Sequence, residues 1–316
     1  MVPFDNVLDM IGNTPMVDVS RLSPNPDVRI FAKLEGQNPF GSVKDRIAKS
    51  MIEQAEKSGK LQPGQTILEP SSGNTGIALA AIAQLKGYPI KILMPSSVSI
   101  ERRQMLDVFG AEVILTPGEE GSNGAVRRAQ EMAAAHPEWC FLYQYGNDAN
   151  PLAHYEGTGP EIWRDCPEIT HFVAGLGTSG TLMGTGRYLK EQNSSIKVIA
   201  VEPPLGERVE GLRNLEDGYI PPVFEQWYGF ELLDRKRVVR PRESLEWTRR
   251  LVRECGVFAG ISSGASMAGA AKVASEISDG VIVFIVCDGG WKYLSTGAYT
   301  DDLDDAERQA EQIIYF

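Results

Sequence analysis

Short apolar runs alternate with amphipathic segments along almost the whole chain. F-V-A-G at 172–175 and V-I-V-F-I-V at 281–286 show no clean alternation of apolar and polar positions. That pattern is typical of strands covered on both faces, as in parallel sheets. The intervening segments carry apolar residues at helical spacing and stop at Gly59, Gly87 and Gly110, where a helix C-terminus favours glycine. The pattern predicts an α/β fold.

The same pattern gives the expected elements. Strands are expected at 29–34, 66–69, 90–94, 112–116, 140–145, 171–175, 197–202 and 281–287. Helices are expected at 43–58, 75–86, 99–109, 122–135, 181–191, 244–255, 264–276 and near 291–297. The segment 204–241 is rich in Pro, Gly and charge. We expect it to be one long irregular excursion, and loops of that length are often functional.

Composition narrows the function classes. The 316 residues carry 31 basic and 42 acidic side chains, a formal charge of −11, which argues against binding a nucleic-acid backbone. The four cysteines are far apart and form no C-x-x-C pair, and no secretory signal precedes them, so we expect reduced thiols in a cytoplasmic protein. No apolar run reaches the roughly 20 residues that span a bilayer. The three histidines have no metal-ligand spacing, so no metal site is expected.

Lys44 is the first candidate for chemistry. It lies in N-P-F-G-S-V-K-D-R at 38–46, at the first turn of an expected helix with Ser42 as N-cap and Asp45 as an acidic capping-box-like partner. A cation is unfavourable at a helix N-terminus, and the same field favours a neutral amine. A neutral amine is what Schiff-base chemistry needs. The alternative is a solvated surface lysine.

A glycine turn offers a second site. The chain reads G-x-G-x-x-G at 175–180 after an expected strand, with Glu202 about 20 residues later, which meets the dinucleotide fingerprint. The turn also carries three hydroxyl donors, Thr178, Ser179 and Thr181. Such a cup favours a phosphate monoester, bound by backbone N–H groups at a helix N-terminus. NAD binding by a dehydrogenase and a plain packing turn are the alternatives.

Two other motifs fail on context. G-I-S-S-G at 260–264 matches a hydrolase nucleophile elbow, but no histidine follows Ser262, and that fold needs one. The segment 36–42 resembles a phosphate-binding loop, but its lysine comes two residues too late. Neither a serine hydrolase nor an ATPase is supported.

A third loop supplies a further candidate binding site. S-S-G-N-T-G at 71–76 lies between an expected strand and helix, and its amides and hydroxyls suit a carboxylate. A plain turn between strand and helix would not need so many donors. A phosphorylated aldehyde cofactor on Lys44, beside an amino-acid carboxylate, would use all three sites.

With these residues in place, the chain resembles the cysteine synthase family of pyridoxal 5′-phosphate enzymes of fold type II, which are tryptophan synthase β-like. The matching segments cover nearly the whole chain in the expected order: I-G-N-T-P at 11–15, N-P-F-G-S-V-K-D-R at 38–46, E-P-S-S-G-N-T-G at 69–76, G-T-S-G-T at 177–181, G-I-S-S-G at 260–264 and Y-L-S-T-G-A at 293–298. The resemblance implies two three-layer α/β/α domains with mostly parallel sheets. It gives a smaller mobile domain at 37–146, and a larger phosphate-binding domain at 1–36 and 147–316.

The resemblance also implies roles for single residues. Lys44 would form the internal aldimine, and once released it would be the general base. The other expected cofactor-binding residues are Asn74 at the phenolic oxygen, Ser262 at the pyridine nitrogen, and Gly177, Thr178, Ser179, Gly180 and Thr181 at the phosphate. The expected substrate-binding residues are Ser71, Ser72, Gly73, Thr75, Gln144 and Arg213. A neutral serine at the ring nitrogen favours loss of the β-substituent to an aminoacrylate, to which sulfur adds.

Two features resemble the phosphoserine-dependent branch that takes sulfur from a thiocarboxylated carrier protein. Arg213 lies in G-L-R-N, where a guanidinium suits a phosphate leaving group; a surface ion pair with Glu210 or Glu216 is the alternative. C-D-G-G-W-K-Y-L-S-T begins at 287, and a tail ending at 313–316 is expected to fold over the site. We therefore expect O-phospho-L-serine and a thiocarboxylate or sulfide to give L-cysteine, in a homodimer. An O-acetylserine sulfhydrylase using sulfide or thiosulfate is the alternative.

Overall fold

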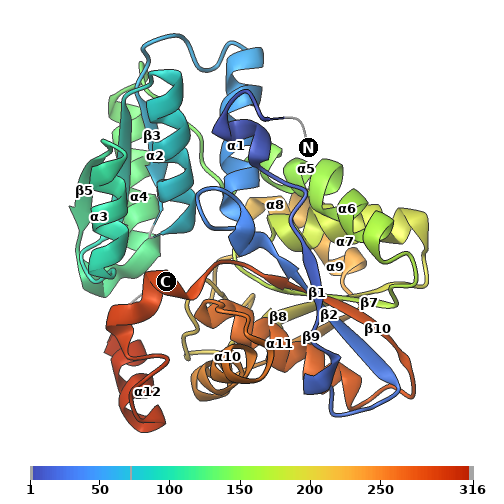
Figure 1. Ribbon diagram of the computed structural model, residues 1–316. Helices are drawn as coiled ribbons and strands as arrows, with labels where there is room; N and C mark the ends of the chain where they lie inside the picture. The colour runs from blue at the N-terminus through green and yellow to red at the C-terminus, as the bar shows by residue number, and fades with distance from the viewer. Residues whose placement is uncertain (1–2, 72, 313–316) are drawn as a thin grey trace.

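Two sheets organise the chain in the computed structural model, which describes residues 3–71 and 73–312 (Figure 1). The six-stranded sheet has the order β1-β2-β10-β7-β8-β9. All its neighbouring strands are parallel except β1 and β2. Its strands are β1 (Met16–Asp18), β2 (Val28–Leu34), β7 (His171–Gly175), β8 (Lys197–Glu202), β9 (Arg235–Val238) and β10 (Gly280–Val286).

The four-stranded sheet is formed by the middle of the N-terminal half. Its order is β5-β4-β3-β6, and all its pairs are parallel. The strands are β3 (Ile67–Pro70), β4 (Ile90–Pro95), β5 (Glu112–Thr116) and β6 (Cys140–Phe141). The predicted α/β fold with mostly parallel sheets is confirmed. The exact domain limits, 37–146 against the remainder, and the mobility of the smaller domain stay predictions.

Helices connect and cover the strands. The α-helices are α1 (Lys44–Lys57), α2 (Asn74–Lys86), α3 (Ile100–Val108), α4 (Gly121–Ala135), α5 (Ala149–Ala153), α6 (Gly159–Asp165), α7 (Gly180–Gln192), α8 (Pro222–Gln226), α9 (Gly229–Leu232), α10 (Pro241–Cys255), α11 (Ile261–Ala274) and α12 (Leu303–Gln312). Shorter helical segments are η1 (Val7–Met10), η2 (Ser20–Leu22), η3 (Glu35–Gln37), η4 (Gly118–Glu120), the π-helix η5 (His154–Thr158) and η6 (Gly290–Thr296). Within the described ranges, no helix is long and apolar enough to cross a bilayer.

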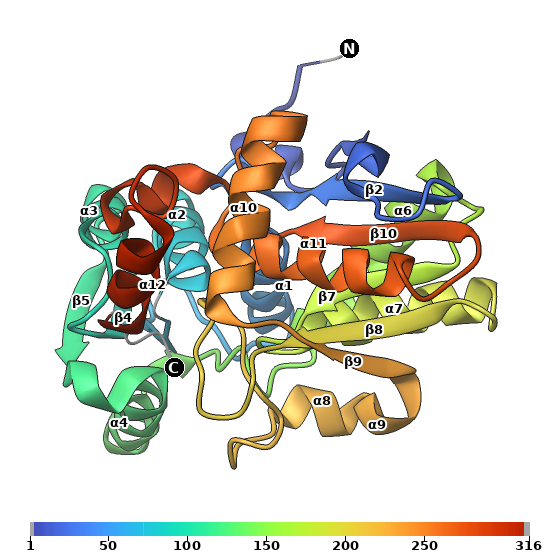
Figure 2. The same cartoon turned by 90° about the horizontal axis from the view of Figure 1, so that it is seen from below.

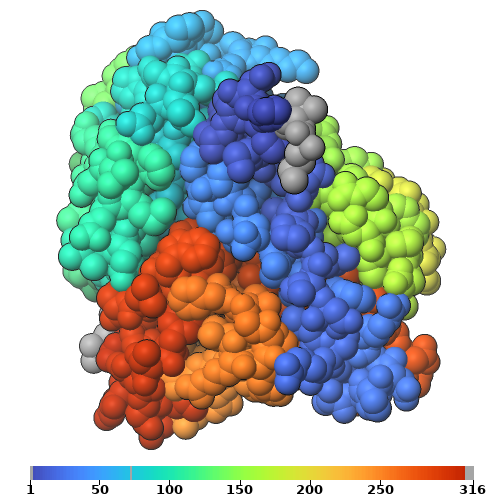
Figure 3. Space-filling model, viewed as in Figure 1, coloured from blue at the N-terminus to red at the C-terminus, as the bar shows by residue number. Residues whose placement is uncertain are grey.

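Each sheet is covered on both faces, which explains its continuous apolar strands. Successive residues of a strand point to opposite faces. In β10, Ile282 and Phe284 pack with α10 and α11, whereas Val281 and Val283 pack with α6 and α7 (Figure 2). In the smaller sheet, α1 and α2 cover one face and α4 covers the other. The two halves meet closely, with η6 against α3 (Figure 3).

Several predicted elements differ from the structure. The strand expected at 140–145 ends at Phe141, because the N–H groups of Tyr143 and Gln144 donate to the Glu69 carboxylate instead of a neighbouring strand. The segment 204–241 is not irregular throughout, since it contains α8, α9 and β9. Also unpredicted were β1, α5, η5, α6 and α12.

Candidate active site

A cavity between the two halves brings together most of the predicted site residues. It follows the carboxyl ends of β3 and β7, which is where open parallel sheets place their ligands. Its volume is about 90 Å³. The described residues that line it are Lys44, Ser71, Gly73, Asn74, Thr75, Arg102, Gln144, Tyr145, Gly177, Thr178, Glu210, Gly211, Ser262 and Tyr293.

Four of the predicted residues that the structure describes are not among those that line the cavity. Ser179, Gly180 and Thr181 lie in the turn that begins α7, directly after the lining residues Gly177 and Thr178. Arg213 lies behind Tyr145, which lines the cavity. Ser72 lies outside the described residues, as does the predicted tail at 313–316.

Lys44 begins α1, but the predicted N-cap at Ser42 and the capping box with Asp45 are wrong. The Lys44 N–H donates to Ser42 Oγ over 3.1 Å, although the residue at the N-cap position is Val43. Asp45 does not close a capping box, because its carboxylate accepts from Ser42 Oγ (3.1 Å) and Phe40 N (2.6 Å) and not from the Ser42 N–H. These hydrogen bonds hold the loop at 40–43 against the first turn of α1.

The Lys44 amine has the protonation tendency that Schiff-base chemistry needs. Burial lowers the pKa of Lys44 below its ordinary value, opposed in part by Cys287 and Asp288. The direction agrees with the prediction, but its main cause is desolvation and not the helix N-terminus on which the prediction rested. A lysine whose charged form is disfavoured is a competent nucleophile and base.

Close packing against Gly211 and Asn150 requires glycine at two positions of the turn between β7 and α7. A Cβ on Gly177 would lie 2.7 Å from Gly211 O, and one on Gly180 would lie 1.8 Å from Asn150 Oδ1. Ser179 has a left-handed φ of 73°, and its buried Oγ has no hydrogen-bond partner in the described chain. A hydroxyl left without a partner, beside free N–H groups at a helix start, suits an oxyanion.

His154 contacts this turn through its ring, a role that no sequence motif indicates. Its Nε2 lies 3.2 Å from Thr181 Oγ1 and its Nδ1 lies 2.9 Å from Thr158 Oγ1. Burial, then the charges of Arg46 and Lys44, lower its pKa well below the ordinary value, so the ring is neutral. If Thr181 donates its proton to a phosphate, it must accept from Nε2–H, which leaves Nδ1 to accept from Thr158.

Asn150 joins the glycine turn to the substrate side of the cavity. Its fully buried amide donates from Nδ2 to Gln144 O (2.9 Å) and to Thr178 Oγ1 (3.0 Å). One side chain therefore fixes both the turn predicted to hold phosphate and the backbone of a residue predicted to hold substrate.

Hydrogen bonds hold the described part of the 71–76 loop at the cavity wall, and its role as a carboxylate site stays a prediction. Ser71 Oγ accepts from Gly76 N over 2.9 Å, and Thr75 Oγ1 donates to Gln144 Oε1 over 2.8 Å. The backbone of Gln144 is held in turn by the buried Glu69 carboxyl, whose pKa burial raises to about 8. The structure thus brings Ser71, Thr75 and Gln144 to one place on the cavity wall.

Asn74 is held by two charged residues that sequence reasoning did not single out. Its Nδ2 donates to Asp288 Oδ2 over 2.8 Å, and its Oδ1 accepts from Lys292 Nζ over 2.6 Å. Asp288 also accepts from the Tyr293 hydroxyl over 2.7 Å. These contacts fix which end of the amide is the donor, and they leave the second Nδ2 proton for a ligand in the cavity.

Ser262 lies in the first turn of α11, which begins at Ile261 and not at the predicted 264. Ser262 is buried and lines the cavity next to Gly211. Its neighbour is the Cys287 thiol, whose pKa burial raises to about 11. The wall at this point is therefore neutral, as the prediction for Ser262 requires.

Arg213 is buried, with its side chain at 0% exposure. Its guanidinium lies 4.6 Å from the Tyr219 ring centre and 5.6 Å from that of Tyr145, within range of a cation–π interaction. It is also 3.8 Å from Asp217. Stacked rings hold it beside the cavity wall.

The surface ion pairs considered for Arg213 are wrong. Glu210 is buried and pairs with Arg102, and Glu216 pairs with Lys236 over 3.2 Å. Sequence proximity suggested these partners, but the chain turns at Gly211, whose φ is 75°. That turn carries Glu210 and Arg213 to different neighbours.

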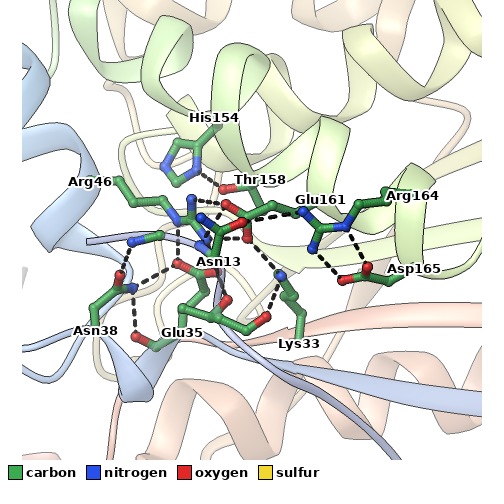
Figure 4. Close-up of polar contacts among 12 residues, drawn as sticks. Asn13, Lys33, Glu35, Asn38, Arg46, His154, Thr158, Glu161, Arg164 and Asp165 are labelled. Atoms are coloured by element: carbon green, nitrogen blue, oxygen red, sulfur yellow. Dashed lines mark hydrogen bonds and ion pairs between the residues drawn. The ribbon is translucent and has the colours of Figure 1, made fainter. Parts of the chain in front are cut away.

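A buried ionic cluster fixes α1 behind Lys44 (Figure 4). Arg46 bridges Glu35 (2.6 Å) and Glu161 (2.7 Å), and Lys33 also contacts Glu161 (2.7 Å). Burial alone would raise the pKa of Glu161, but Arg46 and Lys33 lower it to about 2. The cluster joins β2, η3, α1 and α6, so it holds the start of α1 on the six-stranded sheet.

These residues fit pyridoxal phosphate. The Ser179 Oγ, which has no hydrogen-bond partner among the described residues, suits its phosphate at the start of α7. The Lys44 amine suits its aldehyde, and the remaining N–H of Asn74 suits its phenolic oxygen. Among the described residues no cluster of His, Cys, Asp and Glu could hold a metal ion.

Comparison with known proteins agrees with this geometry. Residues 7–288 match the family described as pyridoxal-phosphate dependent enzyme. The chain is 45% identical to cysteine synthase B of Escherichia coli over 293 residues, 92% of this chain and 95% of that protein. A solved cysteine synthase of Entamoeba histolytica superposes with a TM-score of 0.87 at 35% identity, covering 98% and 96% of the two chains. A solved O-ureido-L-serine synthase gives 0.88 at 36% identity, covering 95% and 97%. The chain therefore belongs to the pyridoxal-phosphate dependent enzymes of fold type II, and among them to the cysteine synthase family.

Proposed function

We propose that the chain makes L-cysteine by replacing the phosphate of O-phospho-L-serine with sulfur. Membership of the cysteine synthase family supports the β-replacement. Arg213, a buried guanidinium stacked on a residue of the cavity wall, supports a phosphate leaving group. Bound pyridoxal phosphate supplies the electron sink that makes the substrate Cα proton acidic.

The chain's own residues then have distinct tasks. The loop at 71–76 and Gln144 bind the substrate carboxylate, which orients the amino acid on the cofactor. Lys44, whose pKa burial lowers, takes the Cα proton as a neutral amine. Ser262 keeps the cofactor nitrogen next to a neutral group, which favours loss of the leaving group over other fates of the carbanion.

Arg213 carries the choice of leaving group. An arginine can bind a phosphate through two parallel hydrogen bonds, which an acetyl group cannot accept. Tyr145 stacks on the guanidinium and also lines the cavity. A rotation of Tyr145 would expose the guanidinium to substrate, so we expect phosphoserine binding to move this ring.

Substitution of Arg213 tests the assignment. We expect Arg213→Ala to lower kcat/KM for phosphoserine by about tenfold or more, because a hydrogen bond to a charged group contributes about 1.5–3 kcal/mol. The same variant should change kcat/KM for O-acetylserine far less. Arg208→Ala is the matched control, since Arg208 is exposed in the same segment. Equal losses with both substrates would refute a phosphate-binding role.

An O-acetylserine sulfhydrylase using sulfide or thiosulfate is the second candidate. Another solved relative, from Entamoeba histolytica, is named O-acetyl serine sulfhydrylase isoform 3. Mixing the holoenzyme with phosphoserine or acetylserine and following the cofactor absorbance would rank the two substrates. The proposal also includes a thiocarboxylated small carrier protein as sulfur donor, which is tested by adding that donor to the reaction. It further includes a homodimer, which is tested by sedimentation.

A further inference from the structure

Arg102 and Glu210 form an ion pair inside the cavity. Arg102 belongs to α3, beside the four-stranded sheet, and Glu210 belongs to the segment after β8 in the other half. The side chains are 3% and 6% exposed, and both residues line the cavity with Lys44. The pair therefore crosses the cavity from one half of the molecule to the other.

The position of Arg102 is that of a ligand-binding group. Its Nε lies 3.3 Å from where a Cβ on Gly73 would be, so the guanidinium lies against the predicted carboxylate loop. Its Cζ is 5.4 Å from the ring centre of Tyr293, another lining residue. Among the described lining residues, Arg102 is the only arginine.

Glu210 is unexpected in the same place. A buried carboxylate repels an anionic substrate, and like charges in a water-poor cavity cost more than they do in solvent. Its Oε2 is buried and has no hydrogen-bond partner in the described chain. Arg102 neutralises the Glu210 carboxylate. An anionic ligand can therefore bind favourably in the cavity only if it replaces Glu210 as the ion-pair partner of Arg102.

We propose that Glu210 is an exchangeable partner of Arg102. Glu210 pairs with the Arg102 guanidinium when the cavity holds no anionic ligand. When substrate binds, the oxyanion of its leaving group replaces Glu210 as the partner of Arg102. Arg102 is then a substrate-binding residue in addition to Arg213, and an anion binds only if it competes successfully with Glu210 for Arg102. Weakly charged leaving groups fail to displace Glu210, so the pair favours a dianion. The identity of that dianion as phosphoserine rests on the proposed function; the exchange itself does not.

Opposite effects of two substitutions test the exchange. The holoenzyme, its cofactor in place, is titrated with inorganic phosphate by calorimetry at low ionic strength. We expect Glu210→Gln to tighten phosphate binding at least about threefold, because the competing carboxylate is gone. We expect Arg102→Gln to weaken it about tenfold or more, and Arg102→Lys to recover part of that loss, since lysine keeps the charge without the fork.

Glu207→Gln is the matched control. Glu207 lies three residues before Glu210 and pairs with Arg240 at the surface, so its removal changes the net charge equally and should leave phosphate binding unchanged. If Glu210→Gln instead weakens phosphate binding, the pair serves only to hold the two halves together and the exchange is wrong. Absence of phosphate binding in Glu210→Gln would overturn it too. A threefold tightening without phosphoserine turnover would keep the exchange and reject the proposed substrate.

Discussion

Burial controls protonation at single residues of this site, and His154 offers the clearest measurement. Its pKa lies well below the ordinary value because the ring is buried near Arg46 and Lys44. Below about pH 6.5, the unfolded chain binds a proton at this residue and the folded chain does not. The contribution of His154 to the free energy of unfolding is therefore fully present above that pH. It decreases as the pH falls, by about 1.4 kcal/mol per pH unit, until the folded-state pKa is reached.

His154→Gln removes this dependence. We expect urea unfolding of the holoenzyme to show a shallower loss of stability in the variant than in the wild type between about pH 6.5 and 5.5. The difference measured near pH 8, where the imidazole is neutral in both states, gives the packing cost alone. Asp45 and Glu69, with pKa values raised to about 7 and about 8, act in the opposite sense but are common to both proteins. Parallel pH profiles would show that His154 takes up a proton while folded.

Local chemistry was visible in the sequence, and long-range support was not. The local motifs at Lys44 and in the glycine turn were identifiable because each depends on neighbours within a few residues, and both reach the same cavity. Asn74 and Asp288 are 214 residues apart, so no local pattern linked them. The contact of His154 with the glycine turn depends on the packing of η5 against α7, which no local pattern of the sequence shows.

At the scale of elements, proline residues and basic residues explain why the apolar pattern did not predict α5, α6 and β9. Helices α5 and α6 contain Pro151 and Pro160, but both prolines lie in a first turn, where proline is tolerated. β9 reads R-K-R-V at the edge of its sheet, and basic residues protect such edges from pairing with other chains. The apolar periodicity that identified the interior strands is absent there.

The position of α1 depends on Arg46, which binds two carboxylates at once. Arg46→Lys keeps the charge but loses the fork that binds Glu35 and Glu161 at once; Glu161 retains Lys33, whereas Glu35 has no other ion-pair partner among the described residues. We expect the free energy of unfolding to fall by about 3–5 kcal/mol, measured by urea denaturation. The pair Arg29–Glu168 is about half exposed, and Arg29→Lys should cost less than about 1 kcal/mol. Similar losses for both variants would contradict a structural role for the buried cluster.

At the scale of the whole molecule, the cavity is completed only where the two halves touch. The strands and helices were predictable because their apolar patterns are local, whereas the pairing of β2 with β10 and the contacts between the two halves join segments far apart in the chain. Glu101 accepts from Ser295 N (3.1 Å) and Ser295 Oγ (2.9 Å), linking α3 to η6. The next residue, Arg102, makes the second link to Glu210. The start of α3 therefore docks the four-stranded half onto the six-stranded half.

This arrangement predicts how closure responds when one link is removed. Glu101→Gln weakens two hydrogen bonds to a charged acceptor, so we expect the opening equilibrium of α3 to rise about tenfold, equivalent to about 1.4 kcal/mol. Hydrogen exchange of the holoenzyme should then be faster in α3 and in the 71–76 loop, and unchanged in α10 and α11. Glu112→Gln is the control, because Glu112 pairs with Lys91 inside the four-stranded sheet. Faster exchange spread evenly over both halves would mean that Glu101 stabilises the fold generally. Exchange confined to α3 and its loop is the behaviour of a smaller domain that moves as a unit against the larger one.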